Sequence, residues 1–316
     1  MSKENTAVTK KKMKRCKEDV VFDAACFIIL TLVLFVVAYP LYWVIISSIS
    51  APSAVSSGKV LLHPIGFTLK GYAEVFKNDQ VMRGFLNSLI ITFCGVMVNL
   101  IVTLPTSYAL SRSNFSGKKP ITIFYLITMF FGGGLIPTYL VIQRLQMLNT
   151  IWALILPGCL SVYNMIVART FFKSNISEEL YEAAEIDGCT QARFFFQIAL
   201  PLSKAIIAIL VLYYGVGHWN SYFSALVYIS DKAKYPLQLV LRNILITNQT
   251  ALSQTATTAA ARAALQEKQQ LIDVMKYSLI IISSIPVLVM YPLVQKHFVK
   301  GVMIGSMKVD LQQKLI

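Results

Sequence analysis

Charged residues are scarce in this sequence. They make up 14% of its 316 residues, and only 15 of them are acidic, against 29 Lys and Arg. A soluble domain carries about one quarter charged residues, whereas here 56% of the residues are apolar. The composition excludes an ordinary soluble domain and predicts a membrane protein. The net charge of +14 does not indicate nucleic-acid binding, because the basic residues lie beside membrane-length segments.

Several chemical groups that would define other functions are also missing. The long apolar runs contain no carboxylate, which an ion-coupled secondary carrier would need at membrane depth. The three histidines, His63, His218 and His297, are spread too widely for an integral-membrane enzyme, and the five cysteines form no metal-ligand spacing. The Ser-Gly-Lys-Lys stretch at 116–119 lacks the features of a phosphate-binding loop, so the chain itself is expected to bind no ATP.

What the sequence does contain is long apolar runs. Crossing a bilayer as a helix takes about 20 apolar residues. Six uncharged runs reach or approach that length, at 24–46, 85–111, 120–143, 145–168, 205–230 and 277–295. The first is too long for a secretory signal and is expected to be retained. Only Arg144 separates the third run from the fourth, which predicts a tight hairpin, and Gly132, Gly133 and Gly134 are expected to lie mid-helix in the third.

The distribution of Lys and Arg predicts that both termini face the cytoplasm. In that orientation the inner segments hold 17 of these residues and the outer segments hold ten. The predicted fold is an all-α integral membrane protein with six transmembrane helices. Its parts are a basic cytoplasmic segment near the lipid surface (1–21), a transmembrane domain (22–298) with an inner loop at 173–204 and outer loops at 47–84 and 231–272, and a cytoplasmic tail (299–316).

Acidic residues gather in the inner loop at 173–204. Five carboxylates lie between Glu178 and Gly188. Ser177, or Asn175 before it, can cap a helix there, and the acidic first turn suits the helix dipole. Gly188 can end this helix by adopting the left-handed conformation. The pattern predicts a helix from the cap to about residue 186, followed by a sharp turn.

A second helix is expected to begin at Thr190, so the inner loop is predicted to be helix, turn, helix. Ala183 and Ala184 are small enough to let another surface approach closely, and Glu182 and Asp187 offer charges to it. A helix lying on anionic lipid would favour Lys and Arg on its polar face. The acidic character therefore indicates a protein partner.

This inner loop resembles the EAA loop of ABC-importer membrane subunits. The letters EAAEIDG and IALPL stand at the family's spacing, and Asp187 fits the version found in carbohydrate importers. Two positions depart mildly from the pattern, Cys189 in place of Ala and Ala205 in place of Pro. Segments 218–229 and 301–308 resemble the fifth helix and the C-terminal tail of these permeases. The matching loop residues are Glu182, Ala183, Ala184, Gly188, Ile198, Leu200 and Pro201.

The resemblance implies a type I ABC importer permease fold in a bacterial plasma (inner) membrane. The chain would pair with a second, homologous permease and with two cytoplasmic ATPase subunits, which would bind ATP and Mg. An extracytoplasmic binding protein would deliver a sugar or oligosaccharide. The chain itself would be no enzyme and would hold no metal or cofactor. ATP-driven motion would reach it through the EAA loop, and the tail residues Gly301, Gly305, Met307 and Lys308 would also contact the ATPase.

Candidate residues for the sugar path are aromatic or hydrogen-bonding groups at membrane depth. Packing against neighbouring helices is the alternative interpretation of each of them. The outer segment 245–268 takes the place of the loop that touches the binding protein in related permeases. The candidates for the path are His218, Trp219, Asn220, Tyr222 and Asn99.

Overall fold

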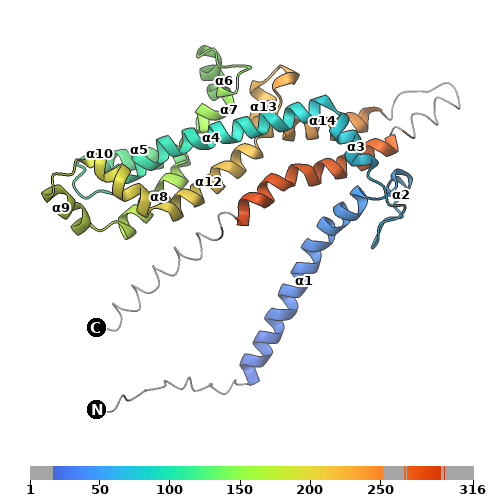
Figure 1. The fold of residues 1–316 in the computed structure, drawn as a ribbon, viewed down its shortest axis with the longest axis horizontal. Coiled ribbons are helices and arrows are strands. Elements are labelled where there is room, and N and C mark those ends of the chain that lie inside the picture. The colour runs from blue at the N-terminus through green and yellow to red at the C-terminus, as the bar shows by residue number, and fades with distance from the viewer. Residues whose placement is uncertain (1–16, 252–266, 268, 293–294, 296–316) are drawn as a thin grey trace.

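The computed structural model describes residues 17–251, 267, 269–292 and 295, and within these residues every regular element is helical. Figure 1 shows an elongated helical bundle with α1 projecting away from it. The elements are α1 (Lys17–Ser48), α2 (Pro52–Ser56), α3 (Lys70–Lys77), α4 (Asp79–Ser111), α5 (Lys118–Phe130), α6 (Leu135–Arg144), α7 (Trp152–Ile155), η1 (Leu156–Gly158), α8 (Val162–Asn175), α9 (Glu178–Ile186), α10 (Gln191–Phe194), the π-helical η2 (Phe195–Ala199), α11 (Leu200–Leu202), α12 (Lys204–Trp219), α13 (Tyr222–Tyr228), η3 (Lys232–Lys234) and α14 (Leu237–Ala251). A C-terminal helix follows at Gln269–Pro292.

The apolar runs of the sequence coincide with the membrane-length elements. Three single helices in the described part of the chain are long and apolar enough to cross a bilayer, namely Glu18–Ser48, Asp79–Ser111 and Gln269–Pro292. Three further apolar stretches are helix pairs, α5 with α6, α7 and η1 with α8, and the segment from α10 to α11 with α12. These pairs are bent by 113°, 52° and 80° respectively. Six spans follow if each pair is one span, and the N-in, C-in orientation stays a prediction.

The mid-helix position expected for the three glycines is wrong. α5 ends at Phe130 and α6 begins at Leu135, so Gly132, Gly133 and Gly134 lie in the break where the chain turns by 113°. Gly134 has a φ of 86°, which a residue with a side chain rarely adopts. The glycines therefore divide the third apolar run into two helices.

The expected helix over 205–230 is also wrong in its bounds. α12 ends at Trp219, and the shorter α13 begins at Tyr222. Side chains satisfy the backbone around this break, because Ser221 Oγ donates to the His218 carbonyl at 2.7 Å. Trp219 Nε1 donates to the Ser283 carbonyl of the C-terminal helix at 2.8 Å, which fixes the end of α12. The uncharged run 205–230 therefore extends beyond the end of α12, which these hydrogen bonds stabilise.

The centre of the bundle is α4, which packs against α8, α12 and α14 (Figure 1). Four of its polar side chains are fully buried, namely Ser88, Asn99, Thr103 and Ser107. The hydroxyls of Thr103 and Tyr214 lie 2.7 Å apart, and Ser107 Oγ donates to the Met165 carbonyl at 3.1 Å. Small and polar residues of this kind join helices inside membranes. α4 is thereby linked to α8 through Ser107 and to α12 through Thr103.

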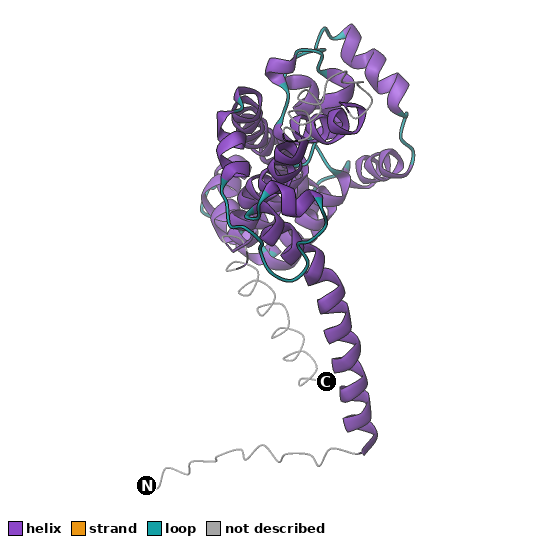
Figure 2. Ribbon diagram, turned by 90° about the vertical axis from the view of Figure 1, so that its right-hand side faces the viewer, coloured by secondary structure: helices purple, strands orange, loops and turns teal. Residues whose placement is uncertain are grey.

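In the described part of the chain, α1 bonds to the loop that follows it near its C-terminal end (Figure 2). Trp43 Nε1 donates to the Val60 carbonyl at 2.8 Å, and Tyr42 Oη donates to the Leu62 carbonyl at 2.6 Å. Both acceptors belong to the predicted outer loop 47–84, which is packed around the buried Val60 and contains α2 and α3. None of the residues in the most apolar stretch of α1 is buried against the described part of the chain.

Candidate coupling site and sugar path

The local structure of the acidic segment follows its sequence closely. Ser177 Oγ accepts a hydrogen bond from the Leu180 backbone N–H at 3.3 Å, and α9 runs from Glu178 to Ile186. Gly188 has a φ of 75°, and the Thr190 hydroxyl caps α10. The predicted cap, helix, glycine turn and second cap are all confirmed, with Ser177 rather than Asn175 as the first cap.

α9 has two faces with different surroundings. Glu182 and Ala183 are exposed, and Ile186, one turn after Glu182, is 87% exposed. Residues three and four apart share a side of a helix, so these residues form one outward face. Tyr181 points the other way and is only 6% exposed. We call the set Glu182, Ala183 and Ile186 the outer face of α9.

The remaining residues of the predicted coupling motif are divided between surface and core. Asp187 is exposed at the end of α9, while Ala184 packs against the cluster that contains Phe172 and Phe194. Ile198 and Leu200 pack against the same cluster. Some residues of the motif therefore form an exposed helix face, and the others pack the segment against the core of the bundle. Pro201 is exposed in α11.

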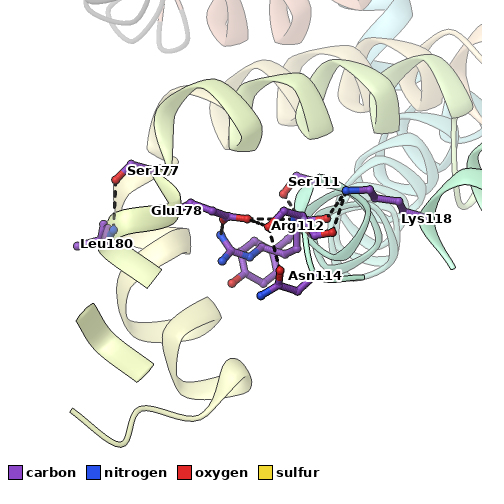
Figure 3. A network of polar contacts seen from close by, with 9 residues as sticks. Ser111, Arg112, Asn114, Lys118, Ser177, Glu178 and Leu180 are labelled. Atoms are coloured by element: carbon purple, nitrogen blue, oxygen red, sulfur yellow. Dashed lines mark hydrogen bonds and ion pairs between the residues drawn. The ribbon is translucent and has the colours of Figure 1, made fainter. Parts of the chain in front are cut away.

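The inward face of α9 meets the end of α4 at Arg112, a contact that our reading of the sequence missed (Figure 3). Arg112 Nη1 lies 2.8 Å from Glu178 Oε2, and its guanidinium carbon lies 3.9 Å from the centre of the Tyr181 ring. The Ser113 backbone N–H donates to Glu178 Oε1 at 3.1 Å, and the Ser113 hydroxyl also donates to it. The signal in the sequence was a lone Arg directly after a long apolar run.

The C-terminal end of α4 is held in place by two basic side chains, one from α5 and one from α8. Lys118 Nζ donates to the Arg112 carbonyl at 3.2 Å and to the Ser113 carbonyl at 3.0 Å. Arg169 Nε of α8 donates to the Leu110 carbonyl at 3.0 Å. Positive groups are favourable at a helix C-terminus, where carbonyls lack partners within the helix. The residues around Arg112 are therefore fixed to α4, α5 and α8.

Two of the predicted path residues, Asn99 and His218, contact each other. Asn99 is fully buried, and its Nδ2 donates to the carbonyls of Gly158 and Cys159 at 2.8 and 2.9 Å. Its Oδ1 lies 2.6 Å from His218 Nε2, which must carry the proton because an amide oxygen only accepts. A Cβ on Gly95 would lie 2.5 Å from that nitrogen. The pair joins α4 to α12, and Asn99 supplies hydrogen-bond donors to the two backbone carbonyls at the break between η1 and α8.

The other path candidates do not converge on one space. Trp219 is buried between α12 and the C-terminal helix. Asn220 is exposed and donates to the Val216 carbonyl of its own helix at 3.1 Å. Tyr222 is 43% exposed at the start of α13. The C-terminal tail candidates at 301–308 and most of the outer segment 245–268 lie outside the described residues.

Our reading of the sequence also missed an open groove of about 510 Å³ between α8, α12 and the C-terminal helix. Tyr163, Tyr213 and Tyr291 line it and are 58%, 43% and 57% exposed. Asn164, which is 6% exposed, lies among them. The tyrosines come from three helices, so no local pattern in the sequence indicates the groove.

Among the described residues no group of three or more His, Cys, Asp or Glu could hold a metal ion.

These features define a class of protein: a helical protein with membrane-length apolar elements, whose polar segment at 173–204 presents one face of a short helix. No family model matches the chain. It is 36% identical to the polygalacturonan/rhamnogalacturonan transport system permease protein YtcP of Bacillus subtilis (strain 168), over 91% of this chain and 98% of that one. It is 29% identical to the galactooligosaccharides transport system permease protein GanQ of the same organism, over 89% and 94%.

A solved structure agrees with these relatives. A chain from a bacterial ABC transporter involved in the import of the acidic polysaccharide alginate matches with a TM-score of 0.80 and 27% identity, over 90% of this chain and 99% of that one. The chain belongs to the family of sugar ABC transporter permeases. It is a multi-pass membrane component of carbohydrate transport, and the predicted family is confirmed.

Proposed function

We propose that this chain forms half of the translocation path of an ATP-driven, binding-protein-dependent oligosaccharide importer in a bacterial plasma membrane. A second, homologous permease forms the other half, and two ATPase subunits supply the free energy. The observation that carries this proposal is the outer face of α9, which ends in the 87% exposed Ile186. An apolar side chain so exposed beside a carboxylate and a small residue fits a protein groove.

In this proposal the outer face of α9 lies in the ATPase. Glu182 meets basic or N–H groups there, and Ala183 permits close approach. ATP and Mg are held by the ATPase subunits, because the sequence contains no phosphate-binding loop. The acidic segment faces the cytoplasm in the N-in, C-in orientation, and the binding protein meets the opposite side. An ion-coupled carrier is not supported, since the apolar runs lack carboxylates.

The exposed apolar surface of α1 is suited to contact with lipid and with a second permease. The apolar side chains of α1 are exposed along most of the helix, including Phe27, Leu34 and Leu41. Such a helix needs an apolar environment on every side. We place it against bilayer lipid and the partner permease, with its anchored end at Trp43 fixing its direction.

Replacing Glu182 by alanine is expected to reduce ATP hydrolysis stimulated by the binding protein about 30-fold or more. Truncating one partner of a buried interfacial charge pair costs about 2–5 kcal/mol, and each 1.4 kcal/mol is a factor of about ten. The measurement is ATP hydrolysis by the reconstituted complex with loaded binding protein. Glu185→Ala is the matched control, because Glu185 is also exposed but lies one turn after Tyr181. Equal losses in both variants would contradict a specific role for Glu182.

We place the sugar path along the groove lined by Tyr163, Tyr213 and Tyr291. Aromatic faces and a buried amide are the groups that suit a sugar ring, which has apolar faces and hydroxyl edges. The helices α8 and α12, which form two of its walls, lead directly into the acidic segment at 173–204. Because YtcP and the alginate transporter are named for acidic polysaccharides, oligosaccharides containing uronic acids are the first substrates to test.

Replacing Tyr213 by alanine is expected to slow sugar import about twofold to twelvefold, since one aromatic contact contributes about 0.5–1.5 kcal/mol. The assay is uptake of labelled uronate oligosaccharide into proteoliposomes that contain ATP. Tyr222→Ala is the control, because the two tyrosines have the same exposure of 43% and only Tyr213 lines the groove. A loss for Tyr222→Ala alone would move the path to the face of α13.

A further inference from the structure

We infer that Arg112 is a positioning residue that makes α9 and α4 move as one unit, so that a pull on the coupling helix reaches the centre of the bundle directly. The inference rests on the proposed function, because it concerns how motion of the ATPase is passed on. It adds a residue outside the acidic segment, 66 positions before its partner Glu178 in the chain.

Arg112 contacts α9 in two ways. Its guanidinium pairs with Glu178 in the first turn of α9 (Figure 3). It also stacks on the ring of Tyr181 one turn later. Glu178 and Tyr181 are three residues apart and therefore lie on the same side of the helix. A planar, charged group that pairs and stacks at once fixes both the position and the rotation of α9.

Arg112 is largely removed from water, while its partner Glu178 is partly exposed. The Arg112 side chain is 12% exposed and the Glu178 side chain is 40% exposed, whereas both partners of an ordinary surface ion pair are fully hydrated and such a pair contributes little. The Tyr108 ring of α4 lies on the guanidinium as well, at 5.9 Å, and Tyr108 is 8% exposed. Arg112 is therefore enclosed by aromatic rings from both helices that it connects.

α4 carries the contact toward the centre of the bundle. Ser107, Thr103 and Asn99 follow along α4 and bond to α8, to α12 and to the break before α8. α9 contacts Arg112 through Glu178 and Tyr181, while the residues of its outer face are exposed. In the proposed complex, the coupling helix is thus held between the ATPase on one face and Arg112 on the other.

The alternative is that α9 transmits its motion only through the chain on either side of it. In that case α8, which ends at Asn175, and α10, which begins at Gln191, would bear the whole load. The contact between Arg112 and Glu178 would then be static packing. Its loss would change the stability of the complex without changing how much sugar is imported for each ATP hydrolysed.

The test compares sugar imported per ATP hydrolysed in proteoliposomes that hold the full complex. Arg112→Lys keeps the charge but removes the planar group that stacks and pairs. We expect Arg112→Lys and Glu178→Gln to lower the import ratio about tenfold, while ATP hydrolysis stays near the wild-type rate. A tenfold change corresponds to about 1.4 kcal/mol. The control Lys119→Gln replaces an exposed cation nearby and should keep the wild-type ratio.

A covalent link between the two helices separates transmission from packing. Ser113→Cys with Glu178→Cys, in a chain without its native cysteines, can be joined by a short bifunctional thiol reagent whose spacer takes the place of the Glu178 carboxylate that contacts Ser113. The unlinked form is expected to import poorly for each ATP, and the linked form to recover toward the wild-type ratio. Recovery supports the inference, and a linked form that imports no better than the unlinked one overturns it. If the wild-type chain binds no ATPase, the proposed function itself fails.

Discussion

Replacing Ile186 by aspartate is expected to detach the ATPase, with an affinity loss on the order of 100-fold. Full burial of an isoleucine contributes about 1.5–3 kcal/mol, and a carboxylate placed in an apolar groove adds a desolvation cost. The sum of about 3 kcal/mol corresponds to more than two factors of ten. Ile186 is 87% exposed in the isolated chain, so the substitution should leave its folding unchanged.

The measurement is co-purification of the ATPase with tagged permease from membranes, at several protein concentrations. Ile186→Leu is the matched control, because it keeps an apolar side chain of nearly the same volume and should retain the ATPase. The thermal stability of the permease alone should be equal in all three proteins. An ATPase that binds Ile186→Asp as tightly as wild type would place the interface on another face of α9.

Replacing Asn99 by leucine is expected to destabilise the membrane bundle by about 2–4 kcal/mol. The change leaves two carbonyls and the His218 N–H without partners in a buried site. Each such group costs about 1–3 kcal/mol in general, and hydrogen bonds measured inside membranes average about 0.6 kcal/mol. The expected value lies between the extremes of these scales.

The stability of the detergent-solubilised protein is measured by the temperature at which its monodisperse elution peak is lost. Asn220→Leu serves as the control, because Asn220 is exposed and bonds only to the Val216 carbonyl of its own helix. It should be close to wild type. If Asn99→Leu were as stable as wild type yet failed to import sugar, Asn99 would belong to the sugar path instead of the helix packing.

The elements that the sequence predicts best are those whose chemistry is local. The cap at Ser177, the helix of α9 and the left-handed Gly188 follow from neighbouring residues, and each is confirmed. The apolar runs likewise correspond to membrane-length elements. Such features depend on backbone hydrogen bonds and hydropathy within a few turns, so no tertiary structure is needed to infer them.

The errors arise where other helices decide the structure. Residues 205–230 are uncharged throughout, yet α12 ends at Trp219, where the indole donates to the C-terminal helix and the Ser221 hydroxyl donates to the His218 carbonyl. The triple glycine at 132–134 was expected inside a helix, although a run of glycines permits a sharp bend equally well. Hydropathy measures the preference for lipid and does not distinguish a straight helix from a bent one.

The contacts at the candidate sites were beyond reach for the same reason. Arg112 and Glu178 are separated by the whole of two predicted spans, and the residues around either one give no sign of the contact. The groove tyrosines come from three helices that meet only in the folded chain. Ile186 is a different case, because an isoleucine on an acidic helix can be read from the sequence once the outward face is known.

The proposed function requires this chain to work with a cytoplasmic ATPase, and purification of the intact complex tests that requirement. Tagged chain is purified from its native membrane in a mild detergent, and its partners are identified while ATP hydrolysis is followed with and without the sugar-loaded binding protein. We expect a second permease, an ATPase and hydrolysis that rises with the loaded binding protein. A chain that purifies alone, in detergent that preserves related complexes, and shows no associated hydrolysis would contradict it.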